Sequence, residues 1–223
     1  MKTLIDEIIN SLFIITILVA WLYIVYILIK YKINPIDQIE LGLKNFERKL
    51  KNIEIVRVSR MDELNKKILQ WAKDRELDKK GTVEAQAIKT VEELSELVKA
   101  VCKDDREEII DAIGDVYVTL VIGNMLDEQV DLEKIYYYAD DDDNTRIDFD
   151  KEDIINNLAT SICHIVEIKR VTYSEIQLYE ILQNLILTAY NYDLDFTDCV
   201  ESAYNVIKNR KGKVVGGQYI KEE

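Results

Sequence analysis

The sequence predicts an all-α protein with three parts. These are an N-terminal transmembrane helix, a helical stalk, and a bundle whose four-helix core contains a degenerate repeat of one helix pair. One proline and seven glycines in 223 residues leave few turns. A long apolar stretch near the N-terminus has the length of a membrane span. Apolar residues recur at steps of three and four along most of the remaining chain, which is the spacing of amphipathic helices.

Residues 1–32 are predicted to form a transmembrane anchor. The chain is apolar from Ile8 to Ile29 except for three uncharged polar residues. At about 1.5 Å per residue this stretch would cross the hydrocarbon core of a bilayer. Lys30 and Lys32 follow it directly, and positive residues prefer the inner side of the membrane. We therefore expect a single-pass membrane protein with a cytoplasmic catalytic domain.

Residues 33–59 are predicted to be an amphipathic stalk or connector. After Pro35, a seam of apolar residues recurs at heptad-like steps over residues 36–53: Ile36, Ile39, Leu43, Phe46, Leu50 and Ile53. Two interpretations stay open. The seam could pair two chains into a homodimer, or the helix could pack on the body of the same chain.

The body, residues 60–223, is expected to begin with a helix of about residues 61–77. Trp71 lies on its apolar face, where a core position is expected, although an indole ring could also stack on a nucleobase. Gly81 and Thr82 then break the chain and cap the next helix.

A helix pair over residues 83–127 carries two stripes of polar and acidic side chains. The first stripe recurs at helical spacing as Gln86, Lys89, Glu93 and Glu96, and the second as Glu108, Asp111 and Asp115. The short link at residues 103–105 favours an antiparallel hairpin, so the stripes would face each other.

Carboxylates that face one another across a helix pair repel unless a cation neutralises them. The donors are all hard oxygens, with no His or Cys on either stripe. Such donors select Mg²⁺, or Mn²⁺ as a substitute. The alternative is a pair of solvated acidic faces, the commonest explanation for charge on amphipathic helices.

The segments Glu92-Glu93-Leu94-Ser95-Glu96 and Ile113-Gly114-Asp115-Val116 resemble the all-α nucleoside triphosphate pyrophosphohydrolases. This MazG-like group is related to dimeric dUTPase and phosphoribosyl-ATP pyrophosphohydrolase, and its signature is EExxE on one helix and ExxD on the next. Ala112 stands where the second motif has its acid, so either Asp111 substitutes or the pair is Glu108 with Asp111. We favour Asp111 with Asp115.

The resemblance implies the site residues and their roles. The metal ligands would be Glu93, Glu96, Asp111 and Asp115. By proximity, Glu92 or Glu108 would orient or deprotonate the attacking water. The run from Ala203 to Lys213 is similar to the basic end of the family, so Asn205, Lys208 and Arg210 would contact the triphosphate. Lys89, within the first stripe, could do likewise. The alternative for this run is a basic helix C-terminus, which the helix dipole favours.

The chain repeats itself weakly when it is shifted by about 64 residues, the offset from Val91 to Ile155. The acids are lost in the second copy, where Glu93 corresponds to Asn157 and Asp115 to Tyr179. We expect a degenerate helix pair over residues 153–192 that packs on the acidic pair, and one metal site per chain. An acidic linker, 140–152, would precede this pair, and a C-terminal helix and basic tail, 195–223, would follow it.

The composition narrows the function. A formal charge of −13 disfavours a nucleic-acid partner, and a single histidine disfavours a zinc site or a histidine-based triad. The resemblance, together with the acidic stripes and the apolar N-terminal stretch, implies Mg²⁺-dependent hydrolysis of a nucleoside triphosphate to the monophosphate and pyrophosphate at a membrane. Two alternatives remain: a non-catalytic nucleotide-sensing module at the membrane, and a structural coiled-coil membrane protein.

Overall fold

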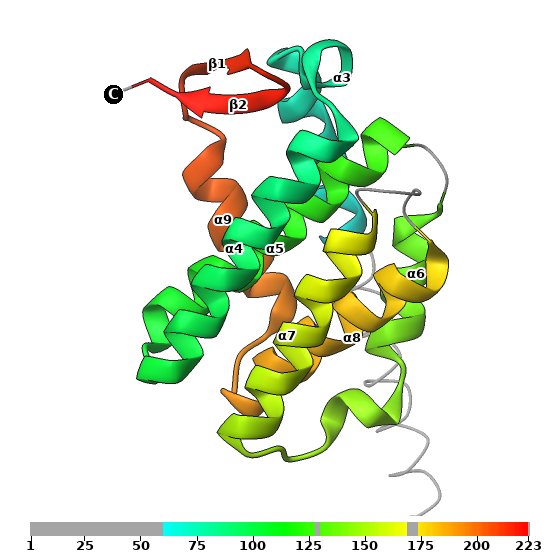
Figure 1. The fold of residues 1–223 in the computed structure, drawn as a ribbon, viewed down its shortest axis with the longest axis vertical. Helices are drawn as coiled ribbons and strands as arrows, with labels where there is room; N and C mark the ends of the chain where they lie inside the picture. Colours follow the sequence, from blue (N-terminus) through cyan, green and yellow to red (C-terminus); the bar gives the residue numbers. More distant parts are fainter. Residues whose placement is uncertain (1–59, 128–129, 169–173, 223) are drawn as a thin grey trace, which may run out of the picture. The chain divides into compact units, whose positions relative to one another are not determined.

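The computed structural model describes residues 60–127, 130–168 and 174–222 (Figure 1). The predicted membrane anchor, 1–32, and stalk, 33–59, lie outside these residues. The described part is mostly helical, which confirms the predicted class for the body of the chain.

The elements follow one another along the chain in this order: a helix that includes residues 60–74, α3 (Leu77–Lys80), α4 (Val83–Lys103), α5 (Arg106–Asp127), α6 (Leu132–Asp140), the 3-10 helix η1 (Asp143–Arg146), α7 (Lys151–Ile168), α8 (Glu175–Asn191), α9 (Phe196–Ile207), β1 (Gly212–Val215) and β2 (Gln218–Lys221). The sequence did not predict α6, and it did not predict the strands.

The predicted acidic helix pair corresponds to α4 and α5, which pack against each other. The side chain of Thr82 caps α4 by accepting a hydrogen bond from the main-chain nitrogen of Ala85. At the other end Asp104 adopts a left-handed conformation, with φ of 53°, and α5 begins two residues later. This tight reversal makes the two helices antiparallel neighbours.

Helix α5 forms the centre of the core. It packs against α4, α8 and α9, and its buried residues lie on all sides of the helix. Tyr117 is fully buried and meets the Phe196 ring edge-on at 5.4 Å. Among the described helices α5 alone is long and apolar enough to cross a membrane. However, 67% of its apolar window is buried inside the fold, as in a core helix.

The second half of the bundle relates to the first through three helices. The offset of 64 residues carries Leu132, the first residue of α6, onto Phe196, the first residue of α9. Both helices begin after an aspartate, Asp131 or Asp195, whose side chain accepts from the main-chain nitrogen three residues later. When the residue numbers are shifted by the same 64 positions, most of α4 falls on α7 and most of α5 falls on α8.

The helices of the two halves interlock. Helix α4 contacts α7, and α5 contacts α8. Helix α6 also packs on α8, and α9 packs on α5 (Figure 1). With α4, α8 and α9 packed against it, α5 has buried residues on all sides.

The C-terminal tail, predicted only as a basic segment, forms a β-hairpin in which Val215 pairs with Gln218. Gly216 and Gly217 form the turn with φ of 59° and 85°, values that favour glycine. The hairpin packs on the start of α4. There the side-chain amide of Gln218 donates to the Ala85 carbonyl at 3.0 Å.

Gly114 lets α9 approach α5 closely. A Cβ at this position would lie 2.3 Å from the carbonyl oxygen of Cys199 and 2.6 Å from Cβ of Ala203. In a helix, alanine is more favourable than glycine by about 1 kcal/mol, but overpacking a core costs about 1–3 kcal/mol. We therefore predict that Gly114→Ala lowers the free energy of unfolding, measured by urea denaturation. A variant as stable as the wild type would contradict the close packing of α5 and α9.

Candidate functional site

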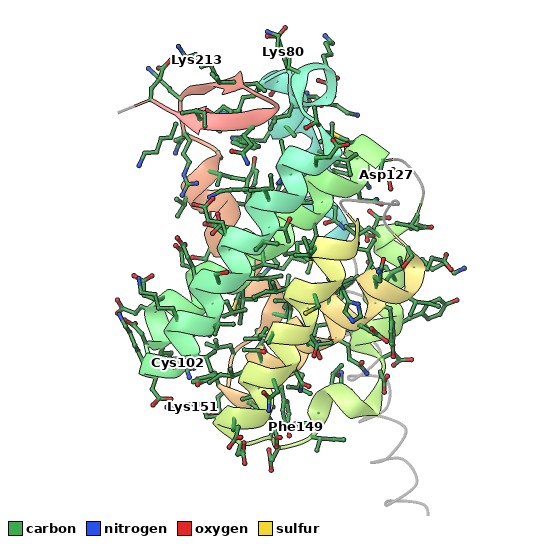
Figure 2. All side chains as sticks on the ribbon, in the orientation of Figure 1. Lys80, Cys102, Asp127, Phe149, Lys151 and Lys213 are labelled. Atoms are coloured by element: carbon green, nitrogen blue, oxygen red, sulfur yellow. The ribbon has the colours of Figure 1, made fainter. Side chains whose placement is uncertain are left out.

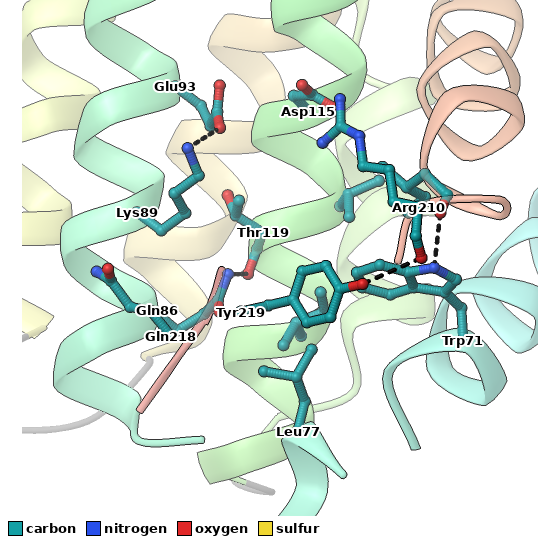
Figure 3. A pocket seen from close by; sticks show the side chains of 13 residues that line it. Trp71, Leu77, Gln86, Lys89, Glu93, Asp115, Thr119, Arg210, Gln218 and Tyr219 are labelled. Carbon is teal, nitrogen blue, oxygen red and sulfur yellow. Dashed lines mark hydrogen bonds and ion pairs between the residues drawn. The ribbon is translucent and has the colours of Figure 1, made fainter. Parts of the chain in front are cut away.

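A cavity lies between α4, α5, the helix of residues 60–74 and the C-terminal hairpin (Figure 3). Charged side chains line one part of it: Lys89, Glu93, Asp115 and Arg210. Aromatic, amide and apolar side chains line the rest: Trp71, Leu77, Gln86, Val118, Thr119, Ile122, Ile207, Gln218 and Tyr219. The cavity thus combines a charged region with an aromatic and apolar region.

Glu93 is the most deeply buried acid of the cavity, with 5% of its surface exposed. Its carboxylate pairs with Lys89 Nζ at 2.7 Å, one helical turn away on α4. Burial raises the pKa of Glu93, and the opposing effect of Lys89 does not cancel it. Burial also disfavours the charged form of Lys89, yet the hydrogen bond and charge of Glu93 leave the pKa of Lys89 raised.

Asp115 enters the same cavity from α5. Burial, followed by the nearby charges of Glu93 and Asp111, raises its pKa to about 7. Arg210 and Lys89 act in the opposite direction but do not restore the ordinary value. Figure 3 shows the Arg210 guanidinium turned toward Asp115.

Burial is the largest cause of the raised pKa of Glu93 and of Asp115. Lys89 offsets it in part at Glu93, and Arg210 and Lys89 do so at Asp115, so the charged form of each carboxyl group is still disfavoured. An additional cation would relieve this, and carboxylate oxygens are the ligands that Mg²⁺ and Mn²⁺ prefer. The donor set therefore fits the predicted metal. Within the described parts of the chain, however, no three His, Cys, Asp or Glu side chains already converge as a metal site.

The structure divides the predicted set of four metal ligands. Glu93 and Asp115 share the cavity, and Asp111 lies one turn from Asp115 on the exposed side of α5. Glu96 lines a second hollow near the α4–α5 turn instead, together with Glu108. Glu96 belongs to the first predicted stripe and Glu108 to the second, but both lie one turn or more along the helix pair from the cavity.

The two predicted catalytic carboxylates also lie apart. Glu92 is exposed, and it shares Lys89 with Glu93, with 3.1 Å between Glu92 Oε2 and Lys89 Nζ. Glu108 belongs to the second hollow, where it lies beside Lys99 and Lys103. Of the two, Glu92 is therefore the one associated with the cavity.

Among the predicted triphosphate-binding residues, Lys89 and Arg210 line the cavity, whereas Asn205 and Lys208 do not. Asn205 and Lys208 are exposed and bind each other, with 2.7 Å between Lys208 Nζ and Asn205 Oδ1. Helix α9 ends at Ile207, and the change of direction that follows it separates Arg210 from these two residues.

Trp71 and Tyr219 form the aromatic wall of the cavity, and the sequence did not identify this wall as a whole. Trp71 is buried and donates its indole N–H to the Ile207 carbonyl at 2.8 Å, and its ring meets Tyr219 edge-on at 5.2 Å. Trp71 is thus a core residue that also lines the cavity, and its stacking on a nucleobase stays a prediction. Tyr219 gave no sequence signal because it lies in a strand of the tail, outside any helical pattern.

Residues 61–141 match the family described as phosphoribosyl-ATP pyrophosphohydrolase, which lies in the MazG-like all-α superfamily. The match includes Lys89, Glu93 and Asp115 but ends before Arg210. A relative in Haemophilus phage HP1 (strain HP1c1), an uncharacterized 18.2 kDa protein in the rep-hol intergenic region, is 44% identical over 62 residues. That alignment covers 28% of this chain and 38% of the relative, so it spans less than half of either protein. No solved structure matches the chain significantly.

The raised pKa of Asp115 predicts a pH dependence of stability when EDTA removes divalent cations. Below about pH 4 the carboxyl is protonated in both the folded and the unfolded chain, so burial carries no penalty. As the pH rises toward about 7 the unfolded chain ionises first, and folding loses stability. Asp115→Asn removes this loss. We expect the melting temperature of the variant to rise relative to the wild type between about pH 5 and pH 8. A difference independent of pH would contradict the shift.

Proposed function

We propose that this protein hydrolyses a nucleoside triphosphate between its α and β phosphates and releases the monophosphate and pyrophosphate. One observation carries the proposal: Glu93 and Asp115, from the helix pair inside the family match, enter one cavity together with Lys89 and Arg210. A cavity with carboxylates and basic groups on one side and an aromatic wall on the other suits a polyphosphate attached to a base.

In this reaction the oxygen of a water molecule attacks the α phosphorus. The bond from that phosphorus to the α–β bridging oxygen breaks, and pyrophosphate leaves with the bonding electrons. Lys89 and Arg210 would bind phosphate oxygens and stabilise the negative charge that develops on them. Glu92 would take the proton from water, because it is the predicted catalytic carboxylate that lies beside Lys89.

Glu93 and Asp115 would hold Mg²⁺, or Mn²⁺ as a substitute, with Asp111, one turn from Asp115, as a further oxygen donor. Glu96, the fourth predicted ligand, lines the second hollow and not this cavity. When bound, such an ion neutralises phosphate charge and lowers the pKa of a coordinated water. The support is the hard-oxygen donor set and the raised pKa of both buried acids. Lys89 provides a positive charge 2.7 Å from Glu93.

The aromatic and apolar part of the cavity would accept the nucleobase. Trp71 and Tyr219 offer ring surfaces, and stacking on an aromatic side chain is favourable for any base. The membrane anchor of residues 1–32 and a homodimer through the 36–53 stalk belong to the same proposal. They would hold the catalytic body at the cytoplasmic face of a bilayer.

A second candidate is a module that binds a nucleotide without hydrolysing it. Two observations favour it: Lys89 already neutralises part of the charge on Glu93, and Ala112 replaces the usual acid of the second motif. We predict that a panel of ribo- and deoxyribonucleoside triphosphates with Mg²⁺ yields a monophosphate and pyrophosphate from at least one member. EDTA should stop the release, and Mn²⁺ should restore it. Thermal stabilisation by a nucleotide without product would favour the binding module.

Replacing the buried acid tests the site directly. We predict that Glu93→Gln lowers Mg²⁺-dependent pyrophosphate release about 100-fold or more, because an uncharged amide binds the cation weakly and no longer pairs with Lys89. The matched control is Glu84→Gln, an exposed position in the first turn of the same helix, which should keep full activity. Far-ultraviolet circular dichroism should be unchanged in both variants. Full activity in Glu93→Gln would contradict the assignment.

A further inference from the structure

Arg75 occupies the turn after the helix of residues 60–74 and does not line the cavity itself. Its guanidinium donates to main-chain carbonyls of its own helix and of the segment that follows α9. Nη2 donates to the Arg210 carbonyl at 2.8 Å and to the Lys208 carbonyl at 3.3 Å. Nη1 donates to the carbonyl of Trp71 at 3.3 Å.

The same guanidinium holds the aromatic wall. Its central carbon lies 4.5 Å from the centre of the Trp71 ring, and Nε is 3.3 Å from the hydroxyl oxygen of Tyr219. Tyr219 in turn donates its hydroxyl to the Arg210 carbonyl at 3.0 Å. Arg75 therefore links three parts of the chain: the first helix of the body, the segment after α9, and strand β2.

These contacts fix residues 208–211, which belong to neither a helix nor a strand. Residues 208–211 connect α9 to β1, and the carbonyls at the end of a helix lack partners within the helix. The rigid fork of an arginine can donate to several such carbonyls at once, which a lysine cannot do in the same geometry. Within residues 60–127, 130–168 and 174–222, Arg75 forms no salt bridge, so its donors serve orientation rather than charge neutralisation.

We propose that Arg75 is a positioning residue for Arg210. It binds the main chain of Arg210 so that the side chain of Arg210 enters the cavity toward Asp115, where the departing pyrophosphate would lie. This inference rests on the proposed function, since Arg210 is the group that would bind the phosphate. It assigns a role to a residue that touches neither substrate nor metal.

Arg106 provides a matched control elsewhere in the fold. It donates through Nη1 to the Tyr192 carbonyl and through Nη2 to the Asp193 carbonyl at 2.8 Å. Like Arg75, it holds the segment that follows a helix, in this case α8, through main-chain carbonyls. It does not line the cavity, so its loss should cost stability without affecting the site.

The test is a double-mutant cycle on the full-length protein with Arg75→Ala, Arg210→Ala and the double variant, with Arg106→Ala as the control. For each protein, kcat, KM and melting temperature are measured. We expect Arg75→Ala to lower kcat/KM about 10- to 100-fold. The kcat of the double variant should be no lower than that of Arg210→Ala alone, because Arg75 acts on the chemical step through Arg210, whereas its contacts with Trp71 and Tyr219 would affect KM. Arg106→Ala should lower the melting temperature while kcat/KM stays at the wild-type value.

Multiplied losses of kcat in the double variant would overturn the proposal, and so would a loss of kcat/KM in Arg106→Ala as large as that in Arg75→Ala. If the wild type binds a nucleotide but releases no pyrophosphate, the proposed function fails, and the same cycle in nucleotide Kd tests Arg75 instead. A wild type that neither hydrolyses nor binds any nucleotide of the panel overturns both.

Discussion

Two carboxylates, Glu93 and Asp115, line one cavity between α4 and α5. The rest of the structure supplies the positive groups that offset the cost of burying them. A buried carboxylate is costly unless a positive group or a hydrogen-bond donor meets it. Lys89 provides one positive group from the same helix as Glu93. The other positive group, Arg210, comes from the segment between α9 and β1. The site is therefore complete only when this C-terminal segment packs against the acidic helix pair.

The packing of α9 explains how that segment reaches the site. Helix α9 packs on α5, and Gly114 permits the close approach. Arg210, which follows α9, then enters the cavity. At the predicted offset of 64 residues the chain has another arginine, Arg146, which instead donates to the carbonyl of Asp140 at 3.1 Å. The part of the chain that carries none of the predicted metal ligands thus contributes a residue to the candidate site.

The positive charge that a polyphosphate would meet lies in the cavity itself. Lys80 in α3 and Lys213 in β1 lie at the end of the bundle that holds the hairpin, as Figure 2 shows. Lys80 pairs with Glu76, and neither lysine lines the cavity. Lys89 and Arg210 do line it, in a chain with a net charge of −13.

Helical spacing was sufficient to place Lys89, Glu93 and Asp115 on facing stripes, because the period of the helix alone determines which side chains share a face. It could not separate Glu96 and Glu108 from this set, since the level at which two helices meet depends on their packing and not on their period. The nine residues of α6 are too few for a clear periodic signal. The paired glycines between Val215 and Gln218 are typical of a two-residue hairpin, but the basic residues before them drew attention to phosphate binding instead. Arg75 belongs to no sequence motif, because its partners are main-chain carbonyls and two aromatic side chains that only the fold brings to it.

The central claim is that Glu93 and Asp115 bind one divalent cation together. Titration of the full-length protein with Mn²⁺, followed by the loss of the electron paramagnetic resonance signal of the free ion, measures this without any assay of activity. The account predicts one site per chain that competes with Mg²⁺ and is lost in Glu93→Gln and in Asp115→Asn alike. Mn²⁺ binding of wild-type affinity in both variants would contradict it.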